Sequence, residues 1–371
     1  MAKLGDVASY INGYAFKPSD WSDTGLPIIR IQDLTGNSYQ ANRYNGEYAL
    51  KYEVNQGDVL ISWSASLGVY VWQGEKALLN QHIFKVIFDK TEISKSFFVH
   101  QVENILEKAS SEAHGATMKH LTKPIFDALP FYLPPLDEQR KIAAVLDKVS
   151  DLIAKRRQQL DKLDELIKAK FVEMFGDEDY PYKELISLIK EGAGLSYGIV
   201  QPGDDGTGDM GVLRPVDLID GKINTTSIKY IDRSIGEGFK KTELYGKELL
   251  ITVRGTTGIT ALTDDRFIGM NVTRGIAVIR YDNEKINPVY LNTYLKTDES
   301  QRYIQERTRG ATLQQINLSD LRVQQILVPP RDEQEQFAAF VEQTEKTKIT
   351  ISKSLEKLET LKKALMQEYF G

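Results

Sequence analysis

The sequence contains no cysteine, and this absence removes several classes of function. Disulfide bonds, thiolate metal sites and cysteine nucleophiles are excluded, and a cysteine-free chain suits a reducing compartment. Histidine is scarce too: the chain has four (His82, His100, His114 and His120), and no pair has the spacing and carboxylate support of a metal site. We therefore expect no bound metal.

Long apolar runs and a surplus of positive charge are also missing. The N-terminal residues lack the apolar segment of a secretory signal, and no run approaches the roughly 20 apolar residues that span a bilayer. We expect a soluble, cytoplasmic protein. Lys and Arg number 47 against 52 Asp and Glu, a formal net charge of −5. If the protein binds nucleic acid, the positive charge must be local or must come from partner subunits.

What the sequence does contain is an internal repeat. Residues 115–176 match residues 310–371 at a constant offset of 195 positions, from a shared Gly-Ala-Thr to a final Phe-Gly. Preceding stretches match more loosely: residues 30–34 match 214–218, residues 58–62 match 248–252, and Asn80 falls against Asn271. Because the matches keep the same order along the chain, we interpret it as a tandem duplication of a globular domain followed by a helix.

The repeated helical segments have an apolar heptad pattern. The first runs from Asp137 to about Phe175 without glycine or proline, and the second from about Asp332 to Phe370, with Thr344 and Lys348 weakening its first half. Neither helix can bury its stripe alone, so we expect an antiparallel coiled coil; the alternative is that each packs only on its own domain. The predicted seam residues are Ile142, Leu146, Val149, Ile153, Leu160, Leu163 and Ile167, then Ile351, Leu355, Leu358, Leu361 and Leu365.

The remaining residues mix short strand-like runs with helical stretches. We expect strands at 27–31, 59–62, 83–88, 249–253 and 275–279, and helices near 94–108 and 288–307. The expected fold class is α+β, a tandem pseudo-twofold repeat of two mixed α/β domains. The domains are predicted at 1–133 and 177–328, and the spacer helices at 134–176 and 329–371.

Catalytic patterns are hard to find in this chain. It has no Walker loop, no Gly-x-Ser-x-Gly elbow and no convincing dinucleotide fingerprint. Asn287-Pro288-Val289-Tyr290 resembles the Asn-Pro-Pro-Tyr/Phe signature of adenine-N6 methyltransferases, but the second proline and a preceding glycine-rich cofactor loop are missing. We interpret this segment as a helix start, with Asn287 as N-cap and Pro288 at the first helical position. No catalytic residue is predicted.

Polar, small and basic side chains recur at matching loops of both domains. Arginine pairs well with guanine and Asn or Gln with adenine, while Gly-Ala-Thr turns before helices suit phosphate. Taken singly, such a residue is more often a solvated loop residue, and only the recurrence favours DNA contact. The candidates are Ser62, Ser64, Ser66, Asn80, Gln81, His82, Thr117 and Lys119 in the first domain, and Arg254, Thr256, Thr257, Thr273, Arg274, Arg309, Thr312, Gln314 and Gln315 in the second.

Over essentially its full length the chain resembles the specificity subunits of type I restriction-modification systems. The most specific parts are Leu-Pro-Pro-Leu-Asp-Glu-Gln-Arg-Lys-Ile-Ala at 133–143 and its copy at 328–338, with the upstream Gly-Ala-Thr elements and the Asn-Gln-His-Ile-Phe segment at 80–84. The second domain departs from the pattern, with Asn-Val-Thr at 271–273 in place of Asn-Gln-His.

This resemblance implies a non-catalytic DNA-recognition subunit. Each globular domain would be a target recognition domain that reads one half of a bipartite double-stranded DNA site. The helices would set the gap between the halves and dock two modification subunits. Those partners, and not this chain, would bind S-adenosylmethionine and methylate adenine, and restriction subunits could join for ATP-driven translocation and cleavage.

Two other functions stay open from the residues alone. The chain could be a DNA adenine methyltransferase in its own right, which predicts that the purified chain binds S-adenosylmethionine. It could instead be a coiled-coil adaptor with two protein-binding heads, which predicts that exchanging one domain leaves DNA specificity unchanged.

Overall fold

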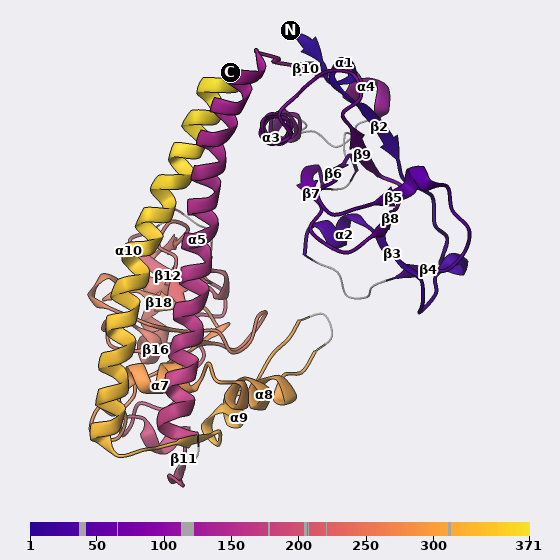
Figure 1. Ribbon diagram of the computed structural model, residues 1–371. Helices are drawn as coiled ribbons and strands as arrows, with labels where there is room; N and C mark the ends of the chain where they lie inside the picture. Colours follow the sequence, from indigo (N-terminus) through magenta and orange to yellow (C-terminus); the bar gives the residue numbers. More distant parts are fainter. Residues whose placement is uncertain are drawn as a thin grey trace. The chain divides into compact units, whose positions relative to one another are not determined.

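A computed structural model of the chain describes residues 1–36, 42–64, 66–112, 122–176, 179–203, 206, 208–219, 221–310 and 313–371. It divides into two compact units, unit 1 (residues 1–158 and 352–371) and unit 2 (residues 159–351). Each unit holds part of both long helices, α5 (Leu136–Phe175) and α10 (Arg331–Phe370), seen in magenta and yellow in Figure 1. No helix of the described chain is long and apolar enough to cross a membrane. The domain boundaries drawn from the sequence stay a prediction.

Unit 1 is a mixed α/β body in which, among its described residues, two sheets have four strands each. The first sheet is antiparallel, with the order β2 (Ser9–Asn12), β9 (Ile83–Ile87), β6 (Val59–Ser62), β7 (Gly68–Val71). The second has the order β4 (Arg43–Tyr44), β3 (Leu26–Ile29), β8 (Ala77–Leu79), β5 (Glu53–Val54), with β3 and β8 parallel. A short pair joins β1 (Ala2–Lys3) to β10 (Pro130–Phe131), and the helices are α1 (Leu4–Val7), α2 (Ile31–Leu34), α3 (Lys95–Glu112) and α4 (Lys123–Ala128).

Unit 2 repeats this plan. An antiparallel sheet has the order β17 (Thr260–Leu262), β16 (Leu249–Thr252), β19 (Ile276–Ile279), and a second sheet has β15 (Lys229–Ile231), β12 (Met210–Leu213), β18 (Asn271–Val272), with β12 and β18 parallel. Two short pairs join β11 (Tyr182–Glu184) to β20 (Gln325–Leu327) and β13 (Leu218–Ile219) to β14 (Lys222–Ile223). The helices are α6 (Arg233–Gly236), α7 (Pro288–Tyr294), α8 (Asp298–Arg307) and α9 (Leu318–Arg322).

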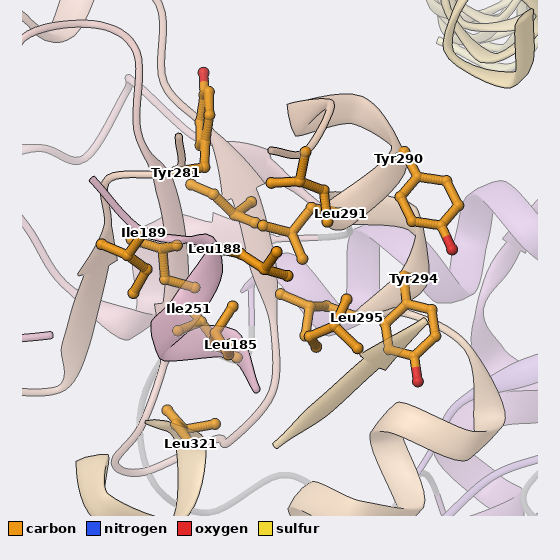
Figure 2. Packing of buried hydrophobic residues seen from close by; sticks show 14 of the residues in the cluster. Leu185, Leu188, Ile189, Ile251, Tyr281, Tyr290, Leu291, Tyr294, Leu295 and Leu321 are labelled. Atoms are coloured by element: carbon orange, nitrogen blue, oxygen red, sulfur yellow. The ribbon is translucent and has the colours of Figure 1, made fainter. Parts of the chain in front are cut away.

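The central strand of each unit is buried on both faces. In unit 1, Val59 and Ile61 lie in the core that includes α3, while Leu60 lies in a second core with β3 and β8. In unit 2, Ile251 packs with the side chains of α7 while Leu250 belongs to the other core (Figure 2). A strand that is covered on both faces needs apolar residues at successive positions. This explains why continuous apolar runs in the sequence predict these strands.

The predicted elements correspond well to observed ones. The five predicted strands are β3, β6, β9, β16 and β19, and the predicted helix near 94–108 is α3. The helix predicted over 288–307 is two helices, α7 and α8. The predicted extension of the first strand to residue 31 is wrong, because the Asp33 carboxylate accepts a 2.7 Å hydrogen bond from the Arg30 amide and starts α2 there.

The helix start at Asn287 is confirmed. Its side-chain oxygen accepts hydrogen bonds from the amides of Val289 (2.9 Å) and Tyr290 (3.3 Å), and Pro288 begins α7. Tyr290 is buried, and its hydroxyl donates a 2.9 Å hydrogen bond to the Leu327 carbonyl on β20. The residues of the methyltransferase-like motif therefore cap and anchor a helix.

The duplicated Pro-Pro-x-Asp-Glu-Gln motif has the same structural role in both units. The side-chain Nε2 of Gln139 donates a hydrogen bond to the Pro134 carbonyl (2.8 Å). Its side-chain Oε1 accepts one from the backbone amide of Ser94 (3.0 Å), just before α3. The buried Gln334 repeats this arrangement, donating to the Pro329 carbonyl (2.8 Å) and accepting from the Asn287 amide (2.8 Å) just before α7. Each glutamine thus fixes the start of a long helix to the start of a domain helix.

The two long helices contact each other inside unit 1. Ile142 and Leu146 of α5 share a core with Met366 of α10. Further along α5, Arg157 Nη2 lies 2.7 Å from Glu359 Oε1. Higher numbers on α5 meet lower numbers on α10, so these two segments run antiparallel.

Within unit 2 the remaining segments of α5 and α10 also run antiparallel to each other. Asp164 Oδ1 lies 2.7 Å from Lys348 Nζ, and the ring centroids of Phe171 and Phe337 are 5.6 Å apart. Thr344, which the heptad pattern predicts as a weak point of the seam, is buried and donates its hydroxyl hydrogen to the Phe340 carbonyl at 2.9 Å. A polar residue is accommodated there because the helix itself satisfies its hydroxyl.

Burial along the helices follows the predicted seam with one correction. Leu361 is 46% exposed, and Lys362, which is half-buried, reaches Glu103 Oε2 at 3.0 Å. The step of four from Leu358 leads to Lys362, so a regular heptad bypasses Leu361. The other predicted positions divide into buried residues (Ile142, Leu146, Val149, Ile153 and Ile167) and half-buried ones (Leu160, Leu163, Ile351, Leu355, Leu358 and Leu365).

Candidate nucleic-acid interface

Three loops of unit 2 that carry candidate DNA-contacting residues meet in the structure. Arg254 forms a β-bridge with Gln315, which also bridges Arg309 through a pair of 2.8 Å backbone hydrogen bonds. The Gly275 carbonyl accepts from the amides of Val253 (2.7 Å) and Arg254 (3.3 Å). Backbone hydrogen bonds therefore join segments 253–258, 273–275, 309–310 and 313–315 into one cluster, which we call the second loop cluster.

Side chains of this cluster divide into anchored and exposed groups. Thr257 is buried, with its hydroxyl oxygen 3.0 Å from that of Thr308. Arg254 is half-buried, and its Nε has no hydrogen-bond partner among the described residues. Thr273 and Gln315 are half-buried, and the exposed candidates are Thr256, Arg274, Arg309 and Gln314.

Within the described chain, the guanidinium groups of this cluster form no ion pairs, whereas many other arginines of unit 2 do. Other arginines of unit 2 do pair with carboxylates: Arg214, Arg233, Arg266, Arg280, Arg307 and Arg331. Arg254, Arg274 and Arg309 thus concentrate uncompensated positive charge on one loop cluster in a chain whose net charge is −5. Local charge of this kind is what a phosphate backbone requires.

Unit 1 brings together its own loops, residues 62–64, 66–68 and 80–82, which we call the first loop cluster. The buried Ser62 hydroxyl donates to the Ser66 carbonyl across the β6–β7 turn. The amide of Trp63 donates to the His82 carbonyl at 3.2 Å, and the two rings lie 4.9 Å apart. His82 has a left-handed backbone (φ 72°), and its buried Nδ1 has no partner among the described residues.

The polar candidates of unit 1 differ in how they are held. Ser64 is buried and Ser66 is exposed. The Asn80 side-chain oxygen accepts a 2.7 Å hydrogen bond from the Gln81 amide, so its acceptor is used within the loop. Thr117, Lys119 and Thr312, together with most of the Gly-Ala-Thr elements, lie outside the described residues.

Several backbone hydrogen bonds recur at equivalent places in the two loop clusters. The Asn80 amide donates to the Ile29 carbonyl (3.2 Å) at the end of β3, as the Thr273 amide donates to the Leu213 carbonyl (2.8 Å) at the end of β12. The bond from Trp63 to His82 likewise recurs from Val253 to Gly275. Equivalent positions in the two units are therefore Asn80 with Thr273, Gln81 with Arg274 and His82 with Gly275.

This equivalence corrects the sequence match of Asn80 with Asn271. Asn271 lies two residues earlier, in β18, where it is buried. Its side-chain oxygen accepts from the Thr242 hydroxyl (2.8 Å), and its nitrogen donates to the Phe239 carbonyl (3.1 Å). Asn271 thus satisfies buried groups of the domain, and the shared residue type misled the alignment.

Sequence reasoning missed a third element of each loop cluster. The Tyr14 amide donates to the Leu79 carbonyl (2.9 Å) and the Tyr14 carbonyl accepts from the Gln81 amide (2.8 Å). In unit 2, Ile199 makes the same pair of bonds, to the Val272 carbonyl (2.8 Å) and from the Arg274 amide (2.9 Å). Exposed tyrosines accompany both: Tyr14 is 44% and Tyr197 39% exposed.

A glycine makes each of these approaches possible. A Cβ on Gly13 would lie 2.0 Å from the Asn80 carbonyl oxygen, and one on Gly198 would lie 2.0 Å from the Val272 carbonyl oxygen. The only signal in the sequence is a glycine after Asn12 in one unit and after Tyr197 in the other. Because the residues that flank Gly13 and Gly198 differ, the equivalence of these two glycines could not be predicted from the sequence and is seen only in the backbone structure.

Metal chemistry has no visible site here. Across the ranges that the structure describes, no group of three or more His, Asp or Glu side chains is placed to hold a metal ion.

Comparisons with known proteins agree on one family. Residues 1–165 and 216–363 match the family model described as the type I restriction modification DNA specificity domain. The EcoBI specificity subunit of Escherichia coli is 26% identical over 371 residues, covering 92% of this chain and 78% of that relative. The putative MjaX specificity subunit of Methanocaldococcus jannaschii is 21% identical over 406 residues, covering 98% and 91%.

Solved structures show the same fold. The S subunit of a type I restriction-modification system from M. genitalium has a TM-score of 0.59 at 12% identity, covering all of this chain and 95% of that one. A chain from a study of complex assembly and conformational transition in the type I system has a TM-score of 0.56 at 16% identity, covering 100% and 96%. The chain therefore belongs to the type I restriction-modification DNA specificity family and is a specificity subunit with two target recognition domains.

Proposed function

We propose that the first and second loop clusters each read one half of a bipartite double-stranded DNA site. The observation that carries this proposal is that equivalent backbone hydrogen bonds hold the two clusters while their side chains differ. A shared frame would place both clusters on the duplex in the same way, and unlike side chains would give the two halves different sequences. His82 in unit 1, for example, corresponds to Gly275 in unit 2.

The long helices would act as the spacer between the two readers. We propose that α5 and α10 form one antiparallel coiled coil that fixes the gap between the half-sites and docks two modification subunits. Antiparallel contacts inside each unit support this, including the ion pairs of Arg157 with Glu359 and of Asp164 with Lys348. Such exposed pairs add little stability, so the buried apolar seam would carry the association.

Chemistry in this scheme belongs to the partners. The modification subunits would bind S-adenosylmethionine and methylate adenine, and restriction subunits would add translocation and cleavage where they are present. Because the chain is acidic overall, we expect it to bind DNA weakly alone and strongly with modification subunits. A gel-shift assay with and without those subunits tests this, and full specific affinity of the lone chain would contradict it.

Two experiments separate the proposal from its alternatives. A calorimetric titration of the purified chain with S-adenosylmethionine should give no heat of binding, whereas a methyltransferase would give a saturable signal. Exchanging the first domain for that of a relative should change half of the methylated sequence in a reconstituted complex. An adaptor that does not contact DNA would leave the methylated sequence unchanged.

A further inference from the structure

We infer that Gln81 and Arg274 are one specificity-determining position that occurs in both recognition domains. On this reading, Gln81 recognises an adenine in the first half-site and Arg274 a guanine in the second. The inference rests on the proposed function and adds the base class and the residue that reads it. It does not follow from the sequence repeat, which aligned Asn80 with Asn271 and so gave Gln81 and Arg274 no common position.

Equivalent backbone hydrogen bonds hold the two residues. The Gln81 amide donates to the Tyr14 carbonyl at 2.8 Å, and the Arg274 amide donates to the Ile199 carbonyl at 2.9 Å. The residue before each one is tied to a neighbouring strand by a further amide hydrogen bond, to the Ile29 carbonyl in unit 1 and to the Leu213 carbonyl in unit 2. Two hydrogen bonds on successive residues fix where each side chain leaves the backbone.

Several neighbouring candidate residues are buried or hydrogen-bonded within their own domain. In unit 1, the Ser62 hydroxyl and the Asn80 oxygen both bond to protein backbone, and Ser64 is buried. In unit 2, Thr257 is buried against Thr308. These residues shape the loops, which leaves fewer side chains to touch a ligand.

Gln81 and Arg274 are available by comparison. Gln81 is half-buried and Arg274 is exposed. Within the described ranges, no protein group hydrogen-bonds to the Gln81 side-chain amide, and no carboxylate pairs with the Arg274 guanidinium. A side chain on a fixed backbone with unused polar atoms is prepared to bind an external partner.

The two side chains prefer different bases in the major groove. A glutamine amide offers one donor and one acceptor, which match adenine N7 and N6. A guanidinium offers two donors, which match guanine O6 and N7. Exchanging the side chains at this shared position should therefore exchange the preferred base, without disturbing the loop that presents it.

The test uses the chain assembled with its modification subunits and a random-sequence duplex library from which methylated sequences are recovered. For Gln81→Arg we expect one position of the first half-site to change from adenine to guanine, with a preference change on the order of 10- to 100-fold, and the second half-site to stay the same. Arg274→Gln should produce the reverse change in the second half-site only.

A matched control separates base reading from added charge. Gln73 is exposed beyond the far end of the β6–β7 hairpin, so Gln73→Arg adds the same charge away from the loop cluster. Gln73→Arg should leave the methylated sequence unchanged. If Gln81→Arg prevents assembly, Gln81→Ala should instead broaden the same single position.

The outcomes distinguish this inference from the proposed function. If the wild-type complex methylates a bipartite sequence and both Gln81 variants keep it unaltered, the shared position is refuted while the proposed function stands. Altered preference in both half-sites from a single substitution also refutes it. If the wild-type complex shows no bipartite preference, the proposed function itself fails.

Discussion

Gly198→Ala is the smallest substitution that should disrupt the second loop cluster. The new Cβ would lie 2.0 Å from the Val272 carbonyl oxygen and 2.6 Å from its carbon. Both atoms belong to the backbone of β18, so a side-chain rotation cannot relieve the clash. The segment carrying Ile199 must move away from β18, and it would lose the bond to the Val272 carbonyl (2.8 Å) and the bond from the Arg274 amide (2.9 Å).

The expected cost follows from these two losses and the overpacking. Each hydrogen bond contributes about 1 kcal/mol, and forcing an extra carbon into a packed site costs about 1–3 kcal/mol. We therefore expect Gly198→Ala to lower the free energy of unfolding of unit 2 by about 3–5 kcal/mol. For a unit of this size that corresponds to a fall in Tm of roughly 6–20 °C.

Differential scanning calorimetry of the full chain measures this shift against a matched control. A Cβ on Gly238, also in unit 2, meets no atom within 4 Å, and that glycine has no positive φ. Gly238→Ala should change stability by less than about 0.5 kcal/mol. If the two variants unfold at the same temperature, the close approach of Gly198 to β18 does not constrain the fold. The same argument for the equivalent Gly13 would then be refuted too.

Three further predictions concern other parts of the molecule. Gln334→Met leaves the buried Pro329 carbonyl and the half-buried Asn287 amide without their partner and should cost about 2–5 kcal/mol in urea unfolding, whereas Gln343→Met, on the exposed side of the same helix, should be nearly neutral. Arg254→Ala should weaken recognition of the second half-site alone by about 1–3 kcal/mol, and equal loss of both halves in a methylation map would argue against it. Inserting one heptad between residues 142 and 167 should change the permitted gap but neither half-site; an unchanged gap would exclude the helix as the ruler.

The sequence by itself determined the features that depend on local periodicity. The absence of glycine and proline and the heptad of apolar residues predicted helices that the structure places at Leu136–Phe175 and Arg331–Phe370. The constant offset of 195 positions revealed the duplication. Continuous apolar runs located the central strands, because a strand buried on both faces has no polar side to obscure it.

The candidate site was predicted only as a set of loops. No residue pattern indicated that Arg254 and Gln315, 61 positions apart, would form a β-bridge, or that the Gly275 carbonyl would accept hydrogen bonds from the amides of both Val253 and Arg254. Residue types also misled: Asn271 resembles Asn80 but satisfies buried groups, while Arg274 shares a backbone position with Gln81.

Only the tertiary structure could decide these pairings. Helix and strand propensity act between neighbours in the chain, so they leave a periodic trace in the sequence. The register between distant segments is set by backbone carbonyls and amides, which every residue has, and by close approaches such as that of Gly198 to Val272. Backbone groups are the same in every residue type and leave no pattern in the sequence. For that reason the equivalence of Gln81 and Arg274 could be recognised only from the backbone hydrogen bonds of the structure, and not from residue identities.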